Sequence, residues 1–437
     1  LLAGARDAAC REQPALAPII TSLHEVLTGG IAADAPAGVR AALLRVQQVS
    51  GAVMAKGCED TFFYAYTRLL ALNEVGGDPL AFGRDSAEFL TGALARGARW
   101  PATINASATH DTKRGEDLRA RLAALSWMPE RWDACASAWM ADHERWGVHL
   151  AGGPAPGRED RYMLYQTLLG TWPEDGLVDD AYGERIQACA LKSARECGQR
   201  TRWSEPDAAY EEALRQWLAA LLDPGISAAF HAELGKLVAA LAPRAHAISA
   251  AQVVLKCTLP GVPDVYQGSE LGDFSLVDPD NRRAVDFALA RRLLAGEAGS
   301  GAPSLPGKLG LLARCLHLRR ADPALWCQGA ARTVATSPPL PQGVMAFVRE
   351  SADAVALVVV AVADLQALTG TTLACEAGWQ DFAWSDALTG RIQGQHRLDS
   401  LATVLGGMTY AVLIGRRQVA EVRVAPRGGA PDTERAQ

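Results

Sequence analysis

Residues 100–109 read Trp100-Pro-Ala-Thr-Ile-Asn-Ala-Ser-Ala-Thr, and a charged run, His110-Asp-Thr-Lys-Arg-Gly-Glu-Asp, follows directly. The first segment is apolar or small, which indicates a short strand. The second segment places polar side chains at the C-terminal end of that strand. Barrel and open α/β enzymes build their active sites at this position. Alternatively, Asp111 caps the helix that follows it.

A second segment of the same kind lies downstream. Residues 252–268 are rich in apolar and β-branched side chains and end in Pro260-Gly-Val-Pro-Asp-Val-Tyr-Gln-Gly, so they predict another strand that leads into a loop. The charged stretch Asp278-Pro-Asp-Asn-Arg-Arg follows. We therefore expect the chemistry of this protein at these two strand ends.

The flanking sequence predicts mainly helices, followed by a β-rich end. Helical periodicity marks residues 8–48, 116–251 and 305–320. Within the second range, Trp132, Trp139 and Trp146 recur every seven residues, which indicates a core-facing stripe. Residues 325–424 alternate short strands with Gly and Asp turns, typical of a small all-β domain in which 354–363 form a buried strand.

Composition narrows the class of protein. The chain has 437 residues and a net charge of −6, which allows two or three globular domains and gives no basic footprint for nucleic acid or an anionic membrane. Its nine cysteines are scattered without a C-x-x-C pair, so reduced thiols and a cytoplasmic location are expected. No leader, transmembrane span or initiating Met is visible, and the missing Met suggests that the sequence begins inside a longer protein.

Several motif classes are absent from the sequence. His143-Glu144 is not followed by the second histidine of a zinc protease, and no metal site is expected. Phosphate-binding, dinucleotide-binding and serine-hydrolase signatures are also missing. The sequence therefore predicts no cofactor.

The two charged clusters, with three further segments, resemble maltooligosyltrehalose synthase, a family of the α-amylase superfamily (glycoside hydrolase family 13). The resembling segments run in family order: Met54-Ala-Lys-Gly-Cys-Glu-Asp-Thr, Leu72-Asn-Glu-Val-Gly-Gly-Asp-Pro, Ala108-Thr-His-Asp-Thr-Lys-Arg-Gly-Glu-Asp, Leu164-Tyr-Gln-Thr-Leu-Leu-Gly-Thr-Trp-Pro, and Pro260-Gly-Val-Pro-Asp-Val-Tyr-Gln-Gly-Ser-Glu through Val277-Asp-Pro-Asp-Asn-Arg-Arg. The resemblance implies an α/β fold, namely the later part of a (β/α)8 barrel with large helical insertions, followed by a C-terminal all-β domain.

On this resemblance, the chain divides into six parts. These are 1–48, the tail of a helical insertion; 49–115, a barrel segment ending at His110-Asp111; 116–251, a helical insertion; 252–324, the last barrel strand and helix; 325–424, the β-domain; and 425–437, a disordered tail.

The resemblance also implies site residues. Asp111 matches the third carboxylate of the superfamily, which stabilises the transition state, and His110 contacts the same sugar. The other implied substrate contacts are Lys56, Glu59, Asp60, Lys113, Arg114, Glu116, Tyr266, Gln267, Glu270, Asp278, Asp280, Arg282 and Arg283. Lys56 and Lys113 are expected to hold the released glucose. For the charged residues of 56–60 and 113–116, ion pairs that shape the loops are the competing interpretation.

The implied activity is an isomerisation that converts the reducing-end α-1,4 bond of a maltooligosaccharide into an α,α-1,1 bond, a step in trehalose synthesis. The nucleophile signature G-x-R-x-D and the D-x-x-x-N-H segment are both missing, so the nucleophile and general acid are expected upstream of Leu1. The chain alone is then expected to be inactive, with the missing N-terminal half as its partner. Two alternatives stay open: an amylase-type hydrolase, and a non-catalytic glucan-binding or complementing half of a split enzyme.

Overall fold

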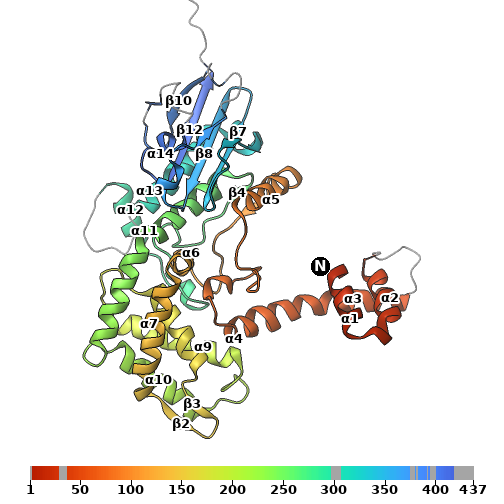
Figure 1. Cartoon of the computed structure of the whole chain (residues 1–437), viewed down its shortest axis with the longest axis vertical. Coiled ribbons are helices and arrows are strands. Elements are labelled where there is room, and N and C mark those ends of the chain that lie inside the picture. The colour runs from red at the N-terminus through yellow and green to blue at the C-terminus, as the bar shows by residue number, and fades with distance from the viewer. Residues whose placement is uncertain are drawn as a thin grey trace, which may run out of the picture. The chain divides into compact units, whose positions relative to one another are not determined.

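The computed structural model describes residues 2–28, 37–296, 307–374, 379, 382–390, 392–393 and 400–417 (Figure 1). The chain divides into two compact units. Unit 1 comprises Leu1–Leu80, Arg131–Leu168 and Val178–His231, and unit 2 comprises Ala81–Glu130, Leu169–Leu177 and Ala232–Gln437. The predicted tail 425–437 lies outside the described residues.

Unit 1 is almost entirely helical. Its elements are α1 (Leu2–Glu12), α2 (Ala17–Thr28), α3 (Ala37–Ala52), a π-helical stretch η2 (Val53–Phe62), α4 (Phe63–Ala65), most of α7 (Pro129–Asp142), most of α8 (Arg158–Thr171), α9 (Asp180–Cys197), α10 (Ala208–Leu222) and the hairpin β2 (Val148–Leu150) with β3 (Gly153–Ala155). The sequence predicts helices over most of these ranges, and the structure agrees.

An aromatic cluster forms the core of unit 1. On α7, Trp132 and Trp139 are buried with their rings 6.0 Å apart, so the predicted stripe is a core stripe. Trp139 also packs edge-to-face on Phe230 at 4.9 Å. The third tryptophan, Trp146, lies beyond the end of α7 and stacks on His143 at 4.8 Å. Offset and edge-to-face packing of this kind adds to the stability that area burial provides.

A buried ion pair joins two helices of unit 1 and predicts a pH effect. Arg195 donates from Nε and Nη2 to the two oxygens of Glu211, at 2.8 and 2.7 Å, and Glu211 is 7% exposed. These bonds lower the pKa of Glu211 against the opposing effect of burial. The stability that Glu211 contributes is therefore present above its unfolded pKa of about 4.3 and is lost as the pH falls through its folded pKa.

We expect Glu211→Gln to lower the free energy of unfolding at pH 7 by about 1–3 kcal/mol, and by less at pH 3. Urea unfolding followed by circular dichroism measures both values. The adjacent Glu212 is exposed and pairs within its own helix with Arg215, so Glu212→Gln is a matched control with a smaller effect. An equal loss in Glu211→Gln at both pH values would contradict the assignment.

Unit 2 contains a six-stranded antiparallel sheet in the order β11-β10-β12-β8-β7-β5. Its strands are β5 (Ala330–Thr333), β7 (Val344–Glu350), β8 (Ala354–Ala361), β10 (Phe382–Asp386), β11 (Ile392–Gln393) and β12 (Tyr410–Arg417), and a separate pair joins β6 (Thr336–Ser337) to β9 (Thr372–Leu373). This sheet lies inside the range 325–424, where the sequence predicts a β-domain. Its standing as a separate domain remains a prediction.

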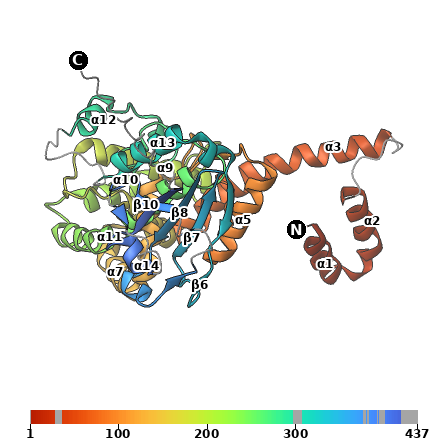
Figure 2. The ribbon, with the colours of Figure 1, turned by 90° about the horizontal axis from the view of Figure 1, so that it is seen from above.

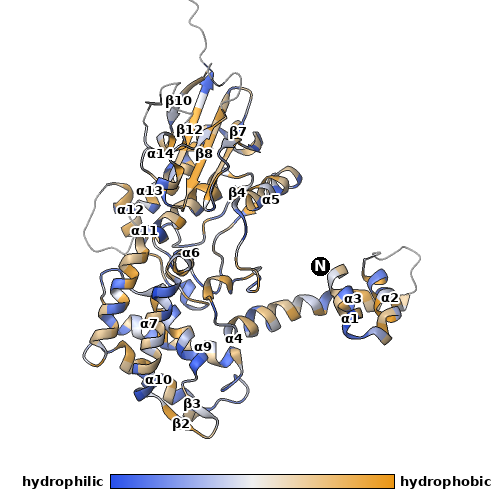
Figure 3. Cartoon of the chain, in the orientation of Figure 1, coloured by the Kyte–Doolittle hydropathy of each residue, from blue (hydrophilic) through white to orange (hydrophobic). Residues whose placement is uncertain are grey.

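Strand β8 lies inside this sheet, and its sequence is a continuous apolar run. All eight of its residues are buried, which confirms the predicted buried strand. Val358 faces a cluster that includes Val254, Leu311 and Trp326, whereas Leu357 faces another that includes Trp384 and the residues of α14 (Leu401–Leu405). A strand covered on both faces needs apolar residues at every position. Figure 3 shows the same apolar character along β7, β8 and β12.

The main helices of unit 2 precede this sheet in the chain, and Leu90, Val254 and Leu311 from three of them belong to the core that packs against it. These helices are α5 (Ser86–Arg99), α6 (Glu116–Ala124), most of α11 (Ala228–Thr258), α12 (Phe287–Leu294) and α13 (Lys308–Ala321). In both views α5 lies beside β7 (Figures 1 and 2). The helix α11 is long and apolar enough to cross a membrane by length and composition, and half of its most apolar window is buried within the structure. Residues such as Val254 and Cys257 belong to the core under the sheet, which is typical of a core helix.

The two predicted strand ends meet in a short parallel pair. β1 (Ile104–Asn105) confirms the first predicted strand and pairs in parallel with β4 (Val262–Pro263), with Ile104 opposite Val262. The second prediction was wrong over most of its length, because residues 252–258 are the last turns of α11. Both forms bury a continuous apolar run, so its sequence does not distinguish them.

Candidate active site

His110 and Asp111 lie at the tip of the loop that joins β1 to α6. Both side chains are exposed, and the Asp111 carboxylate accepts no hydrogen bond from the residues that the structure describes. The backbone around them is fixed instead: Asp111 N donates to Thr109 Oγ1 at 3.2 Å, and Asn281 Nδ2 donates to the carbonyl oxygen of His110 at 2.9 Å. The N-cap of α6 is Gly115, so Asp111 does not cap that helix. An exposed carboxylate on a fixed backbone is suited to contacting a ligand.

A buried ionic network lies at the base of this loop. Glu116 and Asp117, the first residues of α6, are each 2% exposed. Lys308 Nζ lies 2.6 Å from Glu116 Oε1 and 2.5 Å from Asp117 Oδ2, and Lys256 Nζ lies 3.5 Å from Glu116 Oε2. Glu116 is therefore enclosed by lysines, which favours the ion-pair interpretation for this residue over the predicted sugar contact.

The network lowers the pKa of Glu116 and raises the pKa of Asp117. Burial alone would raise the pKa of Glu116, but Lys308 and Lys256 outweigh burial and lower it. Burial, together with the negative charge of Glu116, raises the pKa of Asp117 against the opposing effect of Lys308. Burial alone would lower the pKa of Lys308, but the two carboxylates outweigh burial and raise it. The cation is thus held firmly charged between them.

Asp273, in the second predicted cluster, contacts the first predicted cluster at the start of α6. Asp273 Oδ2 accepts from Glu116 N at 3.2 Å, and its carbonyl oxygen accepts from Asp117 N at 3.1 Å. A Cβ atom at Gly115 would lie 2.4 Å from the carbonyl oxygen of Asp273, so only glycine allows this approach. The backbone of 273–276 is thereby fixed against the start of α6.

Asn281 connects the second predicted cluster to His110. The Tyr266 hydroxyl donates to the Asn281 carbonyl oxygen at 3.2 Å, and Asn281 in turn contacts His110. Asp280 accepts from Leu276 N at 2.7 Å and pairs with Arg283 at 3.0 Å, while Asp278 pairs with Arg282. Gln267 is exposed, and Glu270 is half-buried. The structure therefore places Tyr266 beside the Asn281–His110 contact, and it gives Asp278 and Asp280 arginine partners within the same loop.

Lys113 and Arg114, two further predicted sugar contacts, lie in the interior of unit 2. Both side chains are buried, at 4% and 5% exposure. The backbone of Arg114 forms an isolated antiparallel β-bridge with that of Leu276. This burial favours the loop-shaping interpretation for both residues. A direct sugar contact by either residue stays a prediction.

Lys56, Glu59 and Asp60 belong to unit 1, on the π-helical stretch η2. Lys56 Nζ lies 2.5 Å from Asp60 Oδ2, and Glu59 Oε1 accepts from Gly76 N at 3.1 Å. π-Helical turns occur frequently at functional sites. Their predicted place in one pocket with Asp111 stays a prediction.

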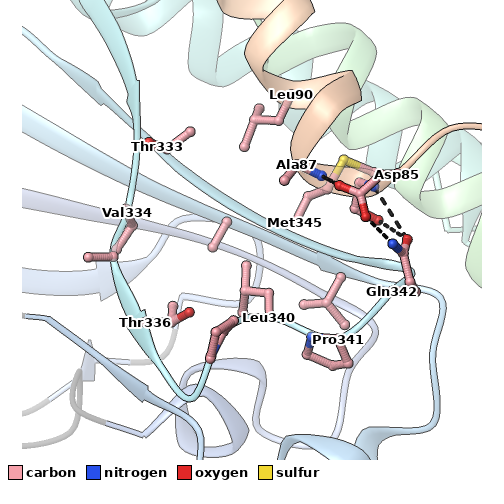
Figure 4. Close-up of a pocket in the computed structure, with 15 residues that line it drawn as sticks. Asp85, Ala87, Leu90, Thr333, Val334, Thr336, Leu340, Pro341, Gln342 and Met345 are labelled. Carbon is pink, nitrogen blue, oxygen red and sulfur yellow. Dashed lines mark hydrogen bonds between the residues drawn. The ribbon is translucent and has the colours of Figure 1, made fainter.

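A cavity of about 470 Å³ lies elsewhere in unit 2, between the start of α5 and residues 333–346 (Figure 4). It is lined mainly by apolar side chains (Ala, Leu, Val, Pro and Met), with Asp85 and Gln342 hydrogen-bonded at its edge. None of the predicted site residues lines it. In the part of the chain that the structure describes, no group of three or more His, Cys, Asp or Glu side chains could hold a metal ion.

Comparison with known proteins identifies the family. No family model matches the chain. A putative maltooligosyl trehalose synthase of Mycobacterium tuberculosis is 40% identical over 361 residues, which are 81% of this chain and 43% of that protein. The solved maltooligosyltrehalose synthase of Arthrobacter ramosus aligns with a TM-score of 0.74 and 34% identity over 95% of this chain and 51% of that chain. This chain belongs to the maltooligosyltrehalose synthase family.

A further solved structure, titled maltooligosyl trehalose synthase, agrees with a TM-score of 0.66 and 26% identity over 85% of this chain and 47% of its own. The chain thus spans about half the length of the family members it matches. The fold neighbours are maltooligosyltrehalose synthases, rich in helices and containing a sheet. The later-barrel arrangement predicted from the sequence is a finer statement and stays a proposal.

Sequence reasoning missed four residues of this candidate synthase site: Lys256, Asp273, Asn281 and Lys308. Lys256 lies in the segment 252–268, which the sequence predicts as a strand, and Lys308 lies in the predicted helix 305–320. Nothing in the sequence places either lysine near residue 116. Asn281 lies inside the quoted motif Asp278-Pro-Asp-Asn-Arg-Arg, so its position in a resembling segment was a usable signal.

Proposed function

We propose that this chain is the part of a maltooligosyltrehalose synthase that supplies the transition-state carboxylate, Asp111. In the proposed reaction, an upstream carboxylate attacks the anomeric carbon of the penultimate sugar and a second protonates the leaving oxygen. The released glucose turns within the pocket, and its anomeric hydroxyl attacks the glycosyl-enzyme to form the α,α-1,1 bond. Asp111 accepts hydrogen bonds from the reacting sugar and offsets its oxocarbenium charge.

One observation carries this proposal: the exposed Asp111 carboxylate stands on a loop whose backbone is fixed at both sides, within a segment that matches the family. Catalytic groups need such fixed placement, because small displacements reduce rate steeply. Tyr266 adds an aromatic side chain of the kind that sugar sites use, and its hydroxyl contacts Asn281, the residue that binds the His110 carbonyl oxygen.

The parallel pair β1–β4 supports the later-barrel arrangement. Parallel sheets in proteins are normally covered on both faces and have several strands. Here Ile104 is 70% exposed and Val262, its partner in register, is 49% exposed. Two exposed apolar residues on a two-stranded parallel sheet are explained if the pair continues into a longer sheet in the rest of the family protein. A cytoplasmic location and the six-part domain division stay part of this proposal.

The proposed isomerase and an amylase-type hydrolase form the same glycosyl-enzyme. They differ in whether water reaches it, because attack by water in place of the released glucose gives hydrolysis. The membership of the family favours the isomerase. A non-catalytic complementing half is the second alternative, and the coding sequence upstream of Leu1 distinguishes it: an in-frame stretch with the missing motifs makes the chain a segment of one enzyme. We call the product of that longer frame the extended protein.

We expect the purified 437-residue chain to leave maltopentaose unchanged, because two of the three required carboxylates are not found in it. The extended protein is expected to convert maltopentaose to a product with a trehalose end, with loss of reducing ends and little free glucose. Reducing-end assay and chromatography of both preparations measure this. Turnover above background by the 437-residue chain would show that the catalytic carboxylates are misassigned, and glucose as the main product of the extended protein would indicate the hydrolase.

A further inference from the structure

Lys308 is a buried cation that the proposed reaction does not use. It is the first residue of α13 and is 4% exposed. Its Nζ contacts Glu116 and Asp117, which lie nearly two hundred positions earlier, at 2.6 and 2.5 Å. Its position in the fold therefore depends on tertiary structure and not on its sequence neighbours.

Local preferences disfavour a lysine at this position. A positive charge at a helix N-terminus opposes the helix dipole, and burying an ammonium group costs several kcal/mol unless it is paired. The preceding residue, Gly307, has φ of 83° and provides no side-chain cap. Because both local terms are unfavourable, the stabilising contribution of Lys308 comes from Glu116 and Asp117.

Lys308 belongs to a network of ion pairs and hydrogen bonds at the base of the His110–Asp111 loop. At one end of this loop, Ser107 Oγ donates to Glu116 and accepts from Lys256 Nζ at 2.7 Å. At the other end, Asp117 accepts from Ser249 Oγ at 2.5 Å and from Asp273 N at 2.7 Å. Lys308 joins Glu116 to Asp117, so the two halves of this hydrogen-bonded base form one network.

We propose that Lys308 is a positioning residue for Asp111, acting through Glu116 and Asp117 on the loop of residues 107–116. This inference rests on the proposed function for its catalytic consequence. Its structural half, the restraint of the loop, does not depend on that function. Lys308 lies under the loop with its cation enclosed by carboxylates, so it does not touch the substrate.

The first arm of the test measures the loop itself in the 437-residue chain. Lys308→Met removes the cation and keeps most of the side-chain volume, and Lys236→Met, on the exposed face of α11, is the matched control. We expect amide hydrogen exchange of residues 107–116 to become at least tenfold faster in Lys308→Met, with β7 and β8 unchanged. Unchanged exchange in the loop, or a uniform increase throughout unit 2, would overturn the positioning role.

The second arm measures the reaction in the extended protein. We expect Lys308→Met to lower kcat for maltopentaose at least thirtyfold while KM changes less than threefold, because a displaced Asp111 affects the transition state more than glucan binding. A KM increase with unchanged kcat would contradict the proposal. If the wild-type extended protein shows no turnover, the proposed function fails, and hydrogen exchange still decides the restraint of the loop.

A second variant keeps the test decisive if Lys308→Met does not fold. Lys308→Met combined with Asp117→Asn removes one charge of each sign and avoids an uncompensated buried carboxylate. The proposal predicts that this double variant folds, with faster exchange in residues 107–116 and reduced kcat. A folded double variant with wild-type exchange and wild-type kcat would refute it.

Discussion

Asp111→Asn is expected to lower the turnover of maltopentaose by the extended protein at least a hundredfold, while the melting temperature stays within a few degrees of wild type. A hundredfold effect corresponds to about 2.7 kcal/mol of transition-state stabilisation. The asparagine is nearly isosteric and removes only the charge that offsets the oxocarbenium ion. Since Asp111 is exposed and its carboxylate has no hydrogen-bond donor among the described residues, the fold does not depend on that charge.

Steady-state kinetics with maltopentaose provides the measurement, and circular dichroism checks the fold. Asp353→Asn is the matched control, because Asp353 is an exposed carboxylate of the same unit in the turn between β7 and β8. The control is expected to keep wild-type turnover. If Asp111→Asn retains a tenth of the wild-type turnover or more, the transition-state role is wrong.

Arg349→Ala is expected to cause the largest loss of stability, about 3 kcal/mol or more in the free energy of unfolding. Arg349 lies on β7 and is 1% exposed. Its guanidinium donates at 3.0 Å to the carbonyl oxygens of Thr258, Trp326 and Gly329. Burial lowers the pKa of Arg349 to about 10, which leaves it charged at pH 7. Its removal leaves three carbonyl groups in the interior without a charged donor.

The effect of Arg349→Ala extends to the candidate site. Thr258 ends α11 and is followed within a few residues by β4, which pairs with β1 at the entrance to the His110–Asp111 loop. Urea unfolding measures the loss, and Arg332→Ala on the neighbouring strand β5 is the control. Arg332 is partly exposed and pairs with Glu350 at 3.3 Å, so its loss is expected to cost less than about 1 kcal/mol. Equal losses in the two variants would contradict the buried-donor interpretation.

Many of the helices and the central strand β8 followed from local pattern. The core stripe of Trp132 and Trp139 was predictable because a seven-residue spacing places side chains on one helix face. The buried strand β8 was predictable because it lies in a run of ten consecutive apolar residues, 354–363, that is bounded by Asp353 and Asp364 and is too short to span a membrane. The segment 252–258 was not predictable, since a continuous apolar run is compatible with both a core helix and a core strand.

The candidate site was predictable in part. Asp111 and His110 were found from their position after a short strand, and the family resemblance gave them roles. Glu116 was predicted as a sugar contact because it lies in the same charged segment, and the structure encloses it between Lys256 and Lys308. Sequence adjacency cannot tell which side of a loop a side chain faces, and this accounts for the difference.

The sequence by itself determined the family, the site-bearing strand ends and the residue proposed to carry the chemistry, because these depend on short motifs read in order. Tertiary structure alone decided which charges are buried together. Lys308 reaches Glu116 and Asp117 across a long stretch of chain, and Asn281 reaches His110 in the same way. Such pairings arise when packing of α11, α13 and the 273–281 segment brings distant residues together, and no local pattern records that packing.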